Sequence, residues 1–293
     1  MIENEEGGLT DRKFYPADEE AGFAESKAPS TPQTRHPAYK LAFSDTDFLL
    51  REELRPVRFQ LELLKPEMLL DEAGVGSTLV MYGSARIPPP EAVETVLEGA
   101  EDLPEPDRTI VERLAAKARY YDEAYKLARM VSEKAIVEQG QRQFVICSGG
   151  GPSIMEAANK GASDAGAETI GLNIVLPHEQ APNPYVTPHL SFQFHYFALR
   201  KMHFLLRAKA VAVFPGGFGT FDEFFELLTL VQTGKLKPIP ILLFGREFWE
   251  RVVNWNALVE EGVIGPADIE LITWCETAEE AWGHIAEFYE LER

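Results

Sequence analysis

Short runs of apolar residues alternate along the chain with longer segments whose apolar positions recur at helical spacing. The apolar runs predict strands at residues 78–82, 143–147, 169–176, 211–214, 239–244 and 269–274. The helical patterns cover residues 108–138, 153–165, 192–209, 219–233, 247–260 and 278–290. Because continuous apolar strands alternate with helices, the pattern predicts an α/β fold. We expect a Rossmann-like doubly wound, mostly parallel sheet with helices on both faces.

The amino-terminal part of the chain has a different composition. Residues 1–44 are acidic and rich in Pro, Ser and Thr, with few large aliphatic side chains, which predicts a mobile tail or one that is ordered only by contacts with a partner. Residues 45–74 carry an amphipathic helical pattern, with Pro56 and Pro66 marking expected breaks. We therefore expect one nucleotide-binding domain over residues 45–293, beginning with this N-terminal helical segment.

The charge balance and the cysteines narrow the class of protein. The chain has 28 Lys and Arg against 47 Asp and Glu, a formal net charge of −19, which disfavours nucleic acid as a partner. Two cysteines, Cys147 and Cys275, are too few for a disulfide framework and indicate a reducing compartment. No secretory signal or membrane-spanning apolar run is seen, so the expected location is the cytoplasm, without a membrane partner.

Three glycine-rich turns follow predicted strands: GSAR at 83–86, SGGGPS at 148–153 and PGGFGT at 215–220. In a parallel sheet such turns lie on one edge and can converge on one crevice. None fits the Walker loop or the dinucleotide fingerprint, which leaves a monophosphate as the expected anion. GSAR alone could be an ordinary turn, whereas PGGFGT has more glycine than a turn needs and precedes a helix N-terminus suited to phosphate.

The polar residues near these turns allow two interpretations each. Thr220 and Glu223 form T-x-x-E, which is either a helix capping box or an acid placed beside the phosphate loop. Arg200 and Lys201 lie on an otherwise apolar helix, either as a solvated face or as groups that grip a phosphate or polarise a leaving base. The histidines have no metal-ligand spacing, so we expect no metal, and a G-x-S-x-G elbow is missing.

Together these residues resemble a known family. Arg200-Lys201 followed by PGGFGTFDE at 215–223 resembles the R-K…P-G-G-x-G-T-x-x-E motif of the LOG family, the cytokinin riboside 5′-monophosphate phosphoribohydrolases. GSAR, the run GGGPSIMEAANKGA at 149–162 and T-x-x-Q at 229–232 fit the family over roughly residues 45–290. The N-terminal helical segment and NPY at 183–185 resemble its larger bacterial branch, which acts on nucleotides such as AMP. Its old label, lysine decarboxylase, would require a pyridoxal phosphate site with a Schiff-base lysine, and no such constellation is visible.

The resemblance implies hydrolysis of the N-glycosidic bond of a nucleoside 5′-monophosphate to free base and ribose 5-phosphate, without a cofactor, by a homodimer or higher homo-oligomer. It implies that Arg200 and Glu223 are catalytic. Contacts with the nucleotide are expected from Lys201, Gly216, Gly217, Gly219, Thr220, Thr229, Gly83, Ser84, Gly150, Gly151, Met155 and Asn183. Shorter plant-like members have a substrate-contacting Glu where this chain reads Pro182-Asn183-Pro184. The alternative is a non-catalytic carrier of a nucleotide or of the molybdenum cofactor, which would need Glu223 only as a cap.

Overall fold

The computed structural model describes residues 15–27, 29–177 and 181–291 of the chain. Residues 1–14 of the predicted tail, and the beginning of the predicted loop at 178–189, lie outside the described residues. The chain divides into two compact units, Met1–Leu61 and Glu62–Arg293. The division falls later than the boundary at residues 44 and 45 that composition suggested.

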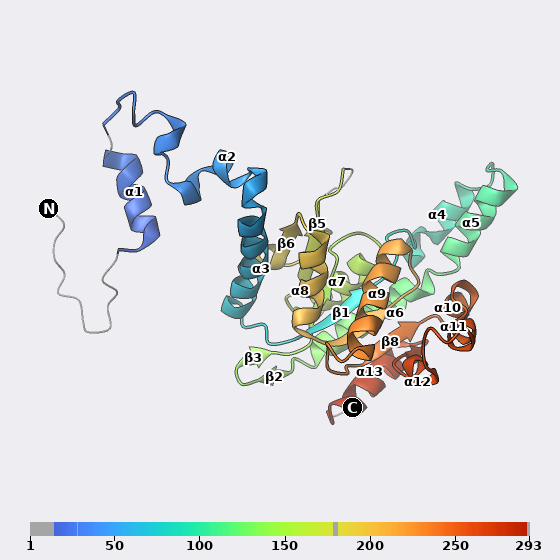
Figure 1. The fold of residues 1–293 in the computed structure, drawn as a ribbon. Helices are drawn as coiled ribbons and strands as arrows, with labels where there is room; N and C mark the ends of the chain where they lie inside the picture. The colour runs from blue at the N-terminus through green and yellow to red at the C-terminus, as the bar shows by residue number, and fades with distance from the viewer. Residues whose placement is uncertain (1–14, 28, 178–180, 292–293) are drawn as a thin grey trace. The chain divides into compact units, whose positions relative to one another are not determined.

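The first unit is built from short helices. It contains α1 (Ala17–Lys27), α2 (Thr46–Leu49) and the beginning of α3 (Arg55–Glu72), with 3-10 turns between them (Figure 1). None of its described residues is buried. The segment therefore forms helix α1, which the composition did not predict, but has no apolar core among its described residues. Its mobility stays a prediction.

The second unit contains one parallel sheet, as predicted, with seven strands where the sequence pattern indicated six. The spatial order is β6-β5-β4-β1-β7-β8-β9, and all of the pairings are parallel. The strands are β1 (Thr78–Tyr82), β4 (Val145–Ser148), β5 (Ile170–Ile174), β6 (Ser191–Phe194), β7 (Ala208–Val213), β8 (Ile241–Phe244) and β9 (Thr273–Cys275). A separate hairpin joins β2 (Val137–Glu138) to β3 (Gln141–Arg142). The chain runs outward from β1 to β6 and then returns to β7, so strand order reverses between β1 and β7, where ligands bind in open α/β sheets.

Helices cover both faces of this sheet, which confirms the predicted layers (Figure 1). Alternate residues of β1 point to opposite sides. Leu79 and Met81 pack with α6 (Arg119–Glu133), α7 (Ile154–Asp164) and α13 (Ala278–Phe288). Val80 and Tyr82 pack in the cluster that includes the end of α3, α8 (Phe197–Leu206) and α9 (Phe218–Gln232). The remaining helices are α4 (Val93–Glu98), α5 (Glu105–Ala115), α10 (Arg246–Val252), α11 (Trp255–Glu260) and α12 (Pro266–Ile269).

Two predicted helices are each divided in the structure. The pattern at 192–209 contains strand β6 before α8, because Phe192 and Phe194 are buried while Gln193 between them is exposed. That alternation has the period of a strand, and β6 pairs in register with β5. The pattern at 108–138 is likewise divided into α5 and α6. A short run of apolar residues did not distinguish a strand from the beginning of a helix.

Pro66 lies inside α3, so the predicted helix break at this residue is wrong. A proline cannot donate to the carbonyl four residues earlier, here that of Glu62. In the structure His203 Nε2 lies 3.0 Å from the Glu62 carbonyl oxygen. Because a carbonyl only accepts, the imidazole donates from Nε2. Burial lowers the pKa of His203, which favours the neutral ring. A side chain of α8 therefore replaces the hydrogen bond that Pro66 removes from α3.

The carboxylate of Glu62 binds the backbone at the N-terminus of α8. Its two oxygens accept hydrogen bonds from the backbone N–H groups of His195 (2.9 Å) and Tyr196 (3.2 Å), just before the helix begins at Phe197. A negative charge at a helix N-terminus is favourable because of the helix dipole. Glu62 thus fixes the helix on which Arg200 lies.

Glu62→Ala is expected to lower the free energy of unfolding by about 1–2 kcal/mol, because two backbone donors lose a charged acceptor. Urea denaturation measures this difference. Glu72→Ala, an exposed acid on the same helix, is the matched control and should change stability little. Equal stability of the Glu62→Ala and Glu72→Ala chains would contradict this role for Glu62.

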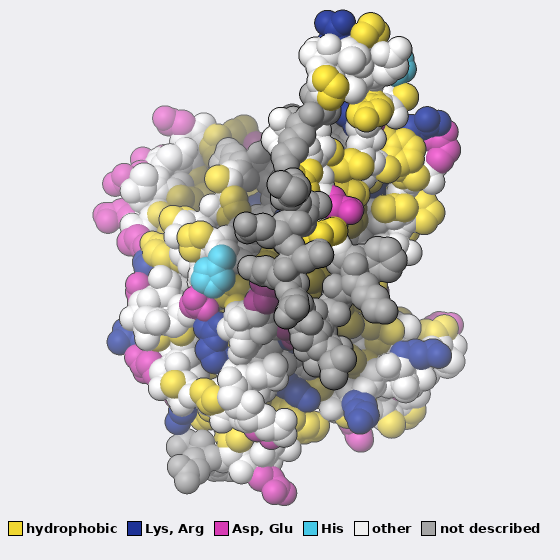
Figure 2. Space-filling view, turned by 90° about the vertical axis from the view of Figure 1, so that its left-hand side faces the viewer, with side chains coloured by type: hydrophobic (Ala, Val, Ile, Leu, Met, Phe, Trp, Pro, Cys, Tyr) yellow, Lys and Arg dark blue, Asp and Glu magenta, His cyan; other side chains and the backbone are white. Residues whose placement is uncertain are grey.

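The surface reflects the acidic composition. Figure 2 shows Lys and Arg side chains scattered over one face among hydrophobic and acidic ones. Their spacing on this face, as far as its described residues show, does not form the continuous basic stripe that a polyanion needs. No helix in the described ranges is long and apolar enough to cross a membrane.

Candidate active site

A pocket of about 630 Å³ lies at the carboxyl ends of the central strands, where strand order reverses. Ligand-binding pockets in proteins commonly have volumes of about 300–1,000 Å³. The residues that line it come from the ends of β1 and β5, from the segments that follow β1, β4 and β5, and from the beginnings of α7, α8 and α9. They are Met81, Tyr82, Gly83, Ser84, Ala85, Arg86, Gly149, Met155, Ile174, Leu176, Phe197, Arg200, Gly217, Phe218, Gly219, Thr220, Phe221 and Glu223. All three predicted glycine turns therefore meet at this pocket.

Helix α9 begins at the pocket without a side-chain cap. Its N-cap residue is Gly217, and no side-chain hydrogen bond caps this end. Gly216 lies so close to Thr220 that a Cβ at Gly216 would clash with the Thr220 side chain. The first N–H groups of a helix have no partner within the helix, and with the helix dipole they favour an anion. The PGGFGT turn thus has the geometry of a phosphate-binding loop.

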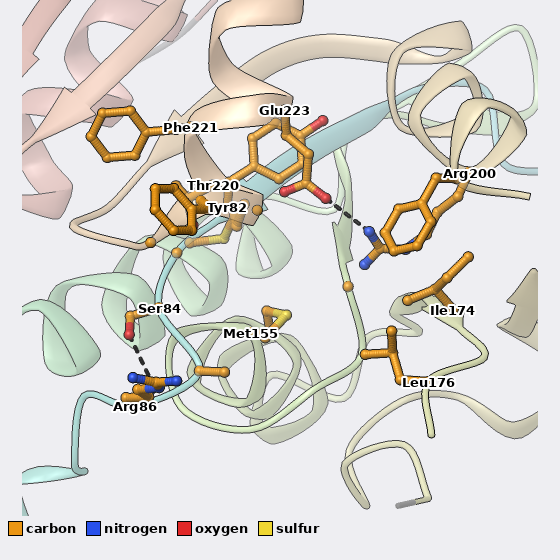
Figure 3. Close-up of a pocket in the computed structure, with 18 residues that line it drawn as sticks. Tyr82, Ser84, Arg86, Met155, Ile174, Leu176, Arg200, Thr220, Phe221 and Glu223 are labelled. Atoms are coloured by element: carbon orange, nitrogen blue, oxygen red, sulfur yellow. Dashed lines mark hydrogen bonds and ion pairs between the residues drawn. The ribbon is translucent and has the colours of Figure 1, made fainter. Parts of the chain in front are cut away.

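The capping-box interpretation of T-x-x-E is wrong. It requires Thr220 to precede the helix, whereas α9 already begins at Phe218, so Thr220 lies inside the first turn. Glu223 is consequently one turn further along, and its carboxylate points toward Arg200 instead of back to the helix start (Figure 3). Glu223 is free for a role in the pocket.

Arg200 and Glu223 form a nearly buried ion pair at the pocket wall. Arg200 Nη1 donates to Glu223 Oε1 at 2.8 Å, and the two side chains are 10% and 13% exposed. Arg200 Nε donates to the carbonyl oxygen of Leu172 at 2.6 Å, and the guanidinium carbon lies 4.9 Å from the centre of the Phe204 ring. Two anchors besides Glu223 therefore orient the guanidinium. Figure 3 shows the pair on one side of the pocket, with Ser84 and Arg86 on the other.

Burial of Glu223 favours the protonated form of its carboxyl group. Burial raises the pKa of Glu223 to about 7, and the charge and hydrogen bond of Arg200 act in the opposite direction. A carboxyl group that exchanges a proton near neutral pH is suited to general acid–base work. Arg200 would also offset the repulsion that an anion at the nearby start of α9 would exert on an ionised Glu223.

The backbone of the SGGGPS turn packs against the guanidinium of Arg200 at Gly149. A Cβ at Gly149 would lie 2.7 Å from both Arg200 Nη2 and Met155 Sδ, so a larger residue there would displace the guanidinium or the methionine. Gly150 has φ of +71°, a conformation that favours glycine. Gly149 thus lets the backbone approach Arg200 closely, and Gly150 lets it approach Asn173.

The structure places many of the predicted site residues in the pocket, and others outside its lining. Those in the lining are Arg200, Glu223, Gly217, Gly219, Thr220, Gly83, Ser84 and Met155; those outside are Lys201, Gly216, Gly150, Gly151, Thr229 and Asn183. Lys201 pairs with Asp222 and Glu226, both at 3.1 Å. The Thr229 hydroxyl donates to the carbonyl oxygen of Phe225 and borders a separate small cavity. Their predicted nucleotide contacts stay predictions.

Asn183 forms hydrogen bonds with the backbone of the SGGGPS turn. Its side-chain amide donates to the Gly151 carbonyl oxygen (3.0 Å) and to Asn159 Oδ1 (2.9 Å), and its backbone N–H donates to the Gly150 carbonyl oxygen (2.8 Å). Asn183 is only 8% exposed. Its observed contacts therefore position the SGGGPS turn.

Several lining residues were not predicted from the sequence. Tyr82 ends strand β1, and burial raises the pKa of its phenol. Phe218, 97% exposed, lies between two glycines of the PGGFGT turn, and Arg86 is the last residue of the GSAR turn. Tyr82, Phe218 and Arg86 could have been found from the sequence, because each lies in or beside a glycine turn. Leu176 and Phe197 carry no motif, and only the fold brings them to the pocket.

Comparison with known proteins finds one matching family model and several distant relatives. Residues 155–285 match the family model described as "Possible lysine decarboxylase". The cytokinin riboside 5′-monophosphate phosphoribohydrolase LOG3 of Arabidopsis thaliana is 25% identical over 175 residues, covering 59% of this chain and 77% of that protein. The enzyme LOG of Oryza sativa subsp. japonica is 27% identical over 167 residues, 56% of this chain and 65% of that protein. Among solved structures, the molybdenum cofactor binding protein of Rippkaea orientalis is similar, with a TM-score of 0.41 and 19% identity over 58% of this chain and 88% of that chain.

Proposed function

We propose that this chain, which belongs to the LOG family of possible lysine decarboxylases and phosphoribohydrolases, hydrolyses the N-glycosidic bond of a nucleoside 5′-monophosphate. The observation that carries the proposal is the buried Arg200–Glu223 pair, at 2.8 Å, in a pocket that also holds an uncapped helix N-terminus. The proposed products are the free base and ribose 5-phosphate. The preference for AMP-like or cytokinin nucleotides, the larger bacterial branch and the homo-oligomeric state remain predictions.

The pocket offers a separate group for each part of such a substrate. The backbone N–H groups at Gly217, Gly219 and Thr220 would bind the 5′-phosphate. The ribose would then lie over the carboxylate of Glu223. The apolar side chains of Ile174, Leu176 and Phe197, on the side of Arg200, would border the base.

The reaction follows from these positions. As the bond between C1′ and the base nitrogen breaks, its electron pair leaves with the base and positive charge develops on the sugar. The ionised carboxylate of Glu223 would stabilise that charge and accept a proton from the water whose oxygen bonds to C1′. Arg200, always a cation, would donate a hydrogen bond to the departing base. The base finally takes a proton from solvent and Glu223 returns its proton to solvent, so one water molecule is consumed for each bond that is broken.

The decarboxylase label has little support in this pocket. Decarboxylation with pyridoxal phosphate needs a lysine that forms a Schiff base. No lysine is found among the described residues that line the pocket, and Lys201 is held by Asp222 and Glu226 outside the lining.

The test is to incubate the protein with AMP, GMP, CMP and a cytokinin nucleotide, and with adenosine, and to separate the products by chromatography. Release of free base from at least one monophosphate, and much slower release from adenosine, is the expected result because the phosphate provides the main anchor. Tight binding of every nucleotide with no release of base would instead favour a carrier.

The rate should depend on the ionisation of Glu223. Because the ionised carboxylate is the active form and its pKa is about 7, kcat should fall by about tenfold per pH unit below that value. Initial rates with saturating AMP between pH 5 and 9 measure this. The slow residual reaction of Glu223→Gln should lack this limb, although the substrate phosphate still titrates near pH 6 in both proteins. If kcat fell in the same way below pH 7 in both proteins, the pH dependence would belong to a group other than Glu223.

A further inference from the structure

A second pocket, of about 280 Å³, lies on the other side of the phosphate loop. It shares Ser84, Arg86 and Gly217 with the first pocket, so the two cavities meet at the loop. Its remaining walls come from α5, from the residues that follow it, from residues in or next to the GSAR and PGGFGT turns and from α10. They are Ile110, Arg113 and Leu114 of α5, Lys117 just beyond its end, Ile87, Pro215, Gly216 and Phe248. The proposed reaction uses none of these walls.

The second pocket gathers positive side chains that have no acidic partner. Arg86, Arg113 and Lys117 line it, and in the described part of the chain none of the three forms an ion pair. Other basic residues of this part of the chain do form ion pairs. Arg108 of α5 pairs with Glu105 and Glu112, and Arg119 of α6 pairs with Glu276. In a chain with 47 acidic and 28 basic residues, three unpaired cations around one cavity indicate a site for an anion.

Lys117 shows the effect of this crowding. Its ammonium donates to the carbonyl oxygen of Arg113 at 2.6 Å and lies 5.9 Å from the centre of the Phe248 ring. Burial lowers the pKa of Lys117, the charges of Arg251 and Arg113 lower it further, and Glu247 acts weakly in the other direction. A bound anion would relieve the repulsion among these cations.

The relation between the pockets suggests what the anion belongs to. A phosphate at the uncapped start of α9 would lie beside Gly217, and Ser84 and Arg86 border both cavities. A second phosphoryl group joined to the first could therefore extend past Ser84 and Arg86 into the second pocket. Arginine and lysine both bind phosphate oxygens strongly through charge-assisted hydrogen bonds.

We propose that the second pocket is a phosphoanion subsite that takes the second phosphoryl group of a nucleoside diphosphate whose first phosphate lies at the PGGFGT loop. The proposal rests on the proposed function for the position of the first phosphate. It concerns binding alone, and a diphosphate held in this way would occupy the active site in competition with the monophosphate.

Calorimetric titration of the full chain with AMP and with ADP tests the subsite. The chain carries Glu223→Gln to prevent turnover, and divalent cations are omitted because they would neutralise the phosphates. ADP should bind at least about tenfold more tightly than AMP. The added double substitution Arg113→Ala and Lys117→Ala should reduce this ratio to about twofold or less while leaving AMP affinity nearly unchanged. Arg108→Ala, an arginine of the same helix outside the pocket, should keep the ratio.

Two results would overturn the subsite: equal affinity for AMP and ADP in the parent chain, or a ratio that survives the double substitution. The double variant's thermal unfolding, compared with that of Arg108→Ala, verifies that it is folded. The comparison is independent of catalysis. Wild-type protein that binds AMP without cleaving it would contradict the proposed function alone, whereas cleavage of AMP without tighter binding of ADP would contradict the subsite alone.

Discussion

Glu223→Gln is expected to lower kcat for AMP hydrolysis by about 10²–10⁴-fold, the range that a general acid–base group contributes. Glutamine keeps the size of the side chain, and its amide oxygen can still accept the hydrogen bond that Arg200 Nη1 donates at 2.8 Å. It cannot take up a proton from water or balance the positive charge that develops on the sugar. KM and the unfolding temperature should change much less than kcat. Initial rates and a thermal melt measure both.

Asp222→Asn is the matched control for that variant. Asp222 precedes Glu223 in α9, but its side chain is 56% exposed and pairs with Lys201. Its loss should change kcat by less than about threefold, because surface ion pairs contribute little. A Glu223→Gln chain that is folded and as active as Asp222→Asn would remove Glu223 from the mechanism.

Arg200→Lys is expected to reduce kcat/KM by about 10²–10³-fold, as the loss of one transition-state donor does. Lysine keeps the positive charge but lacks the planar fork. A guanidinium reaches the carbonyl oxygen of Leu172 and the carboxylate of Glu223 at once, at 2.6 and 2.8 Å, and a single ammonium does not reproduce both bonds. Steady-state kinetics with AMP measure the loss.

An arginine-to-lysine change at an exposed site is the matched control for the effect of Arg200→Lys on kcat/KM. Arg129 of α6 pairs with Glu133 at 2.8 Å on the surface, and Arg129→Lys should leave kcat/KM unchanged. Arg200→Lys with nearly wild-type kcat/KM would mean that Arg200 only neutralises Glu223 and does not assist the departing base.

The fold was predictable where the sequence pattern is long and continuous. The apolar runs of β1 and β8 are buried at every position, so they signal central parallel strands without any knowledge of their neighbours. Strand β6 was not predictable, because its four residues precede an apolar helix and only pairing with β5 identifies them. Pro66 shows the same limit: His203, 137 residues away (203 − 66 = 137), compensates for the proline inside α3.

The candidate site was predictable where glycine turns and charged residues form a motif. Glu223 and Arg200 are the clearest case, because only the resemblance connected two residues that the structure then places in contact. Whether Thr220 caps the helix could not be decided from T-x-x-E, since that depends on where α9 begins. The roles expected of Asn183 and Lys201 depended on tertiary contacts, with Asn159 and Asp222, that no local pattern contains.

The central claim is that the pocket holding Arg200 and Glu223 hydrolyses the bond between the base and C1′ of a nucleoside 5′-monophosphate. The most direct measurement is a reaction of the wild-type protein with AMP in water enriched in oxygen-18, analysed by mass spectrometry. The account predicts equal amounts of adenine and ribose 5-phosphate, with one heavy oxygen in each sugar phosphate. AMP that binds the protein and is recovered intact and unlabelled would contradict it.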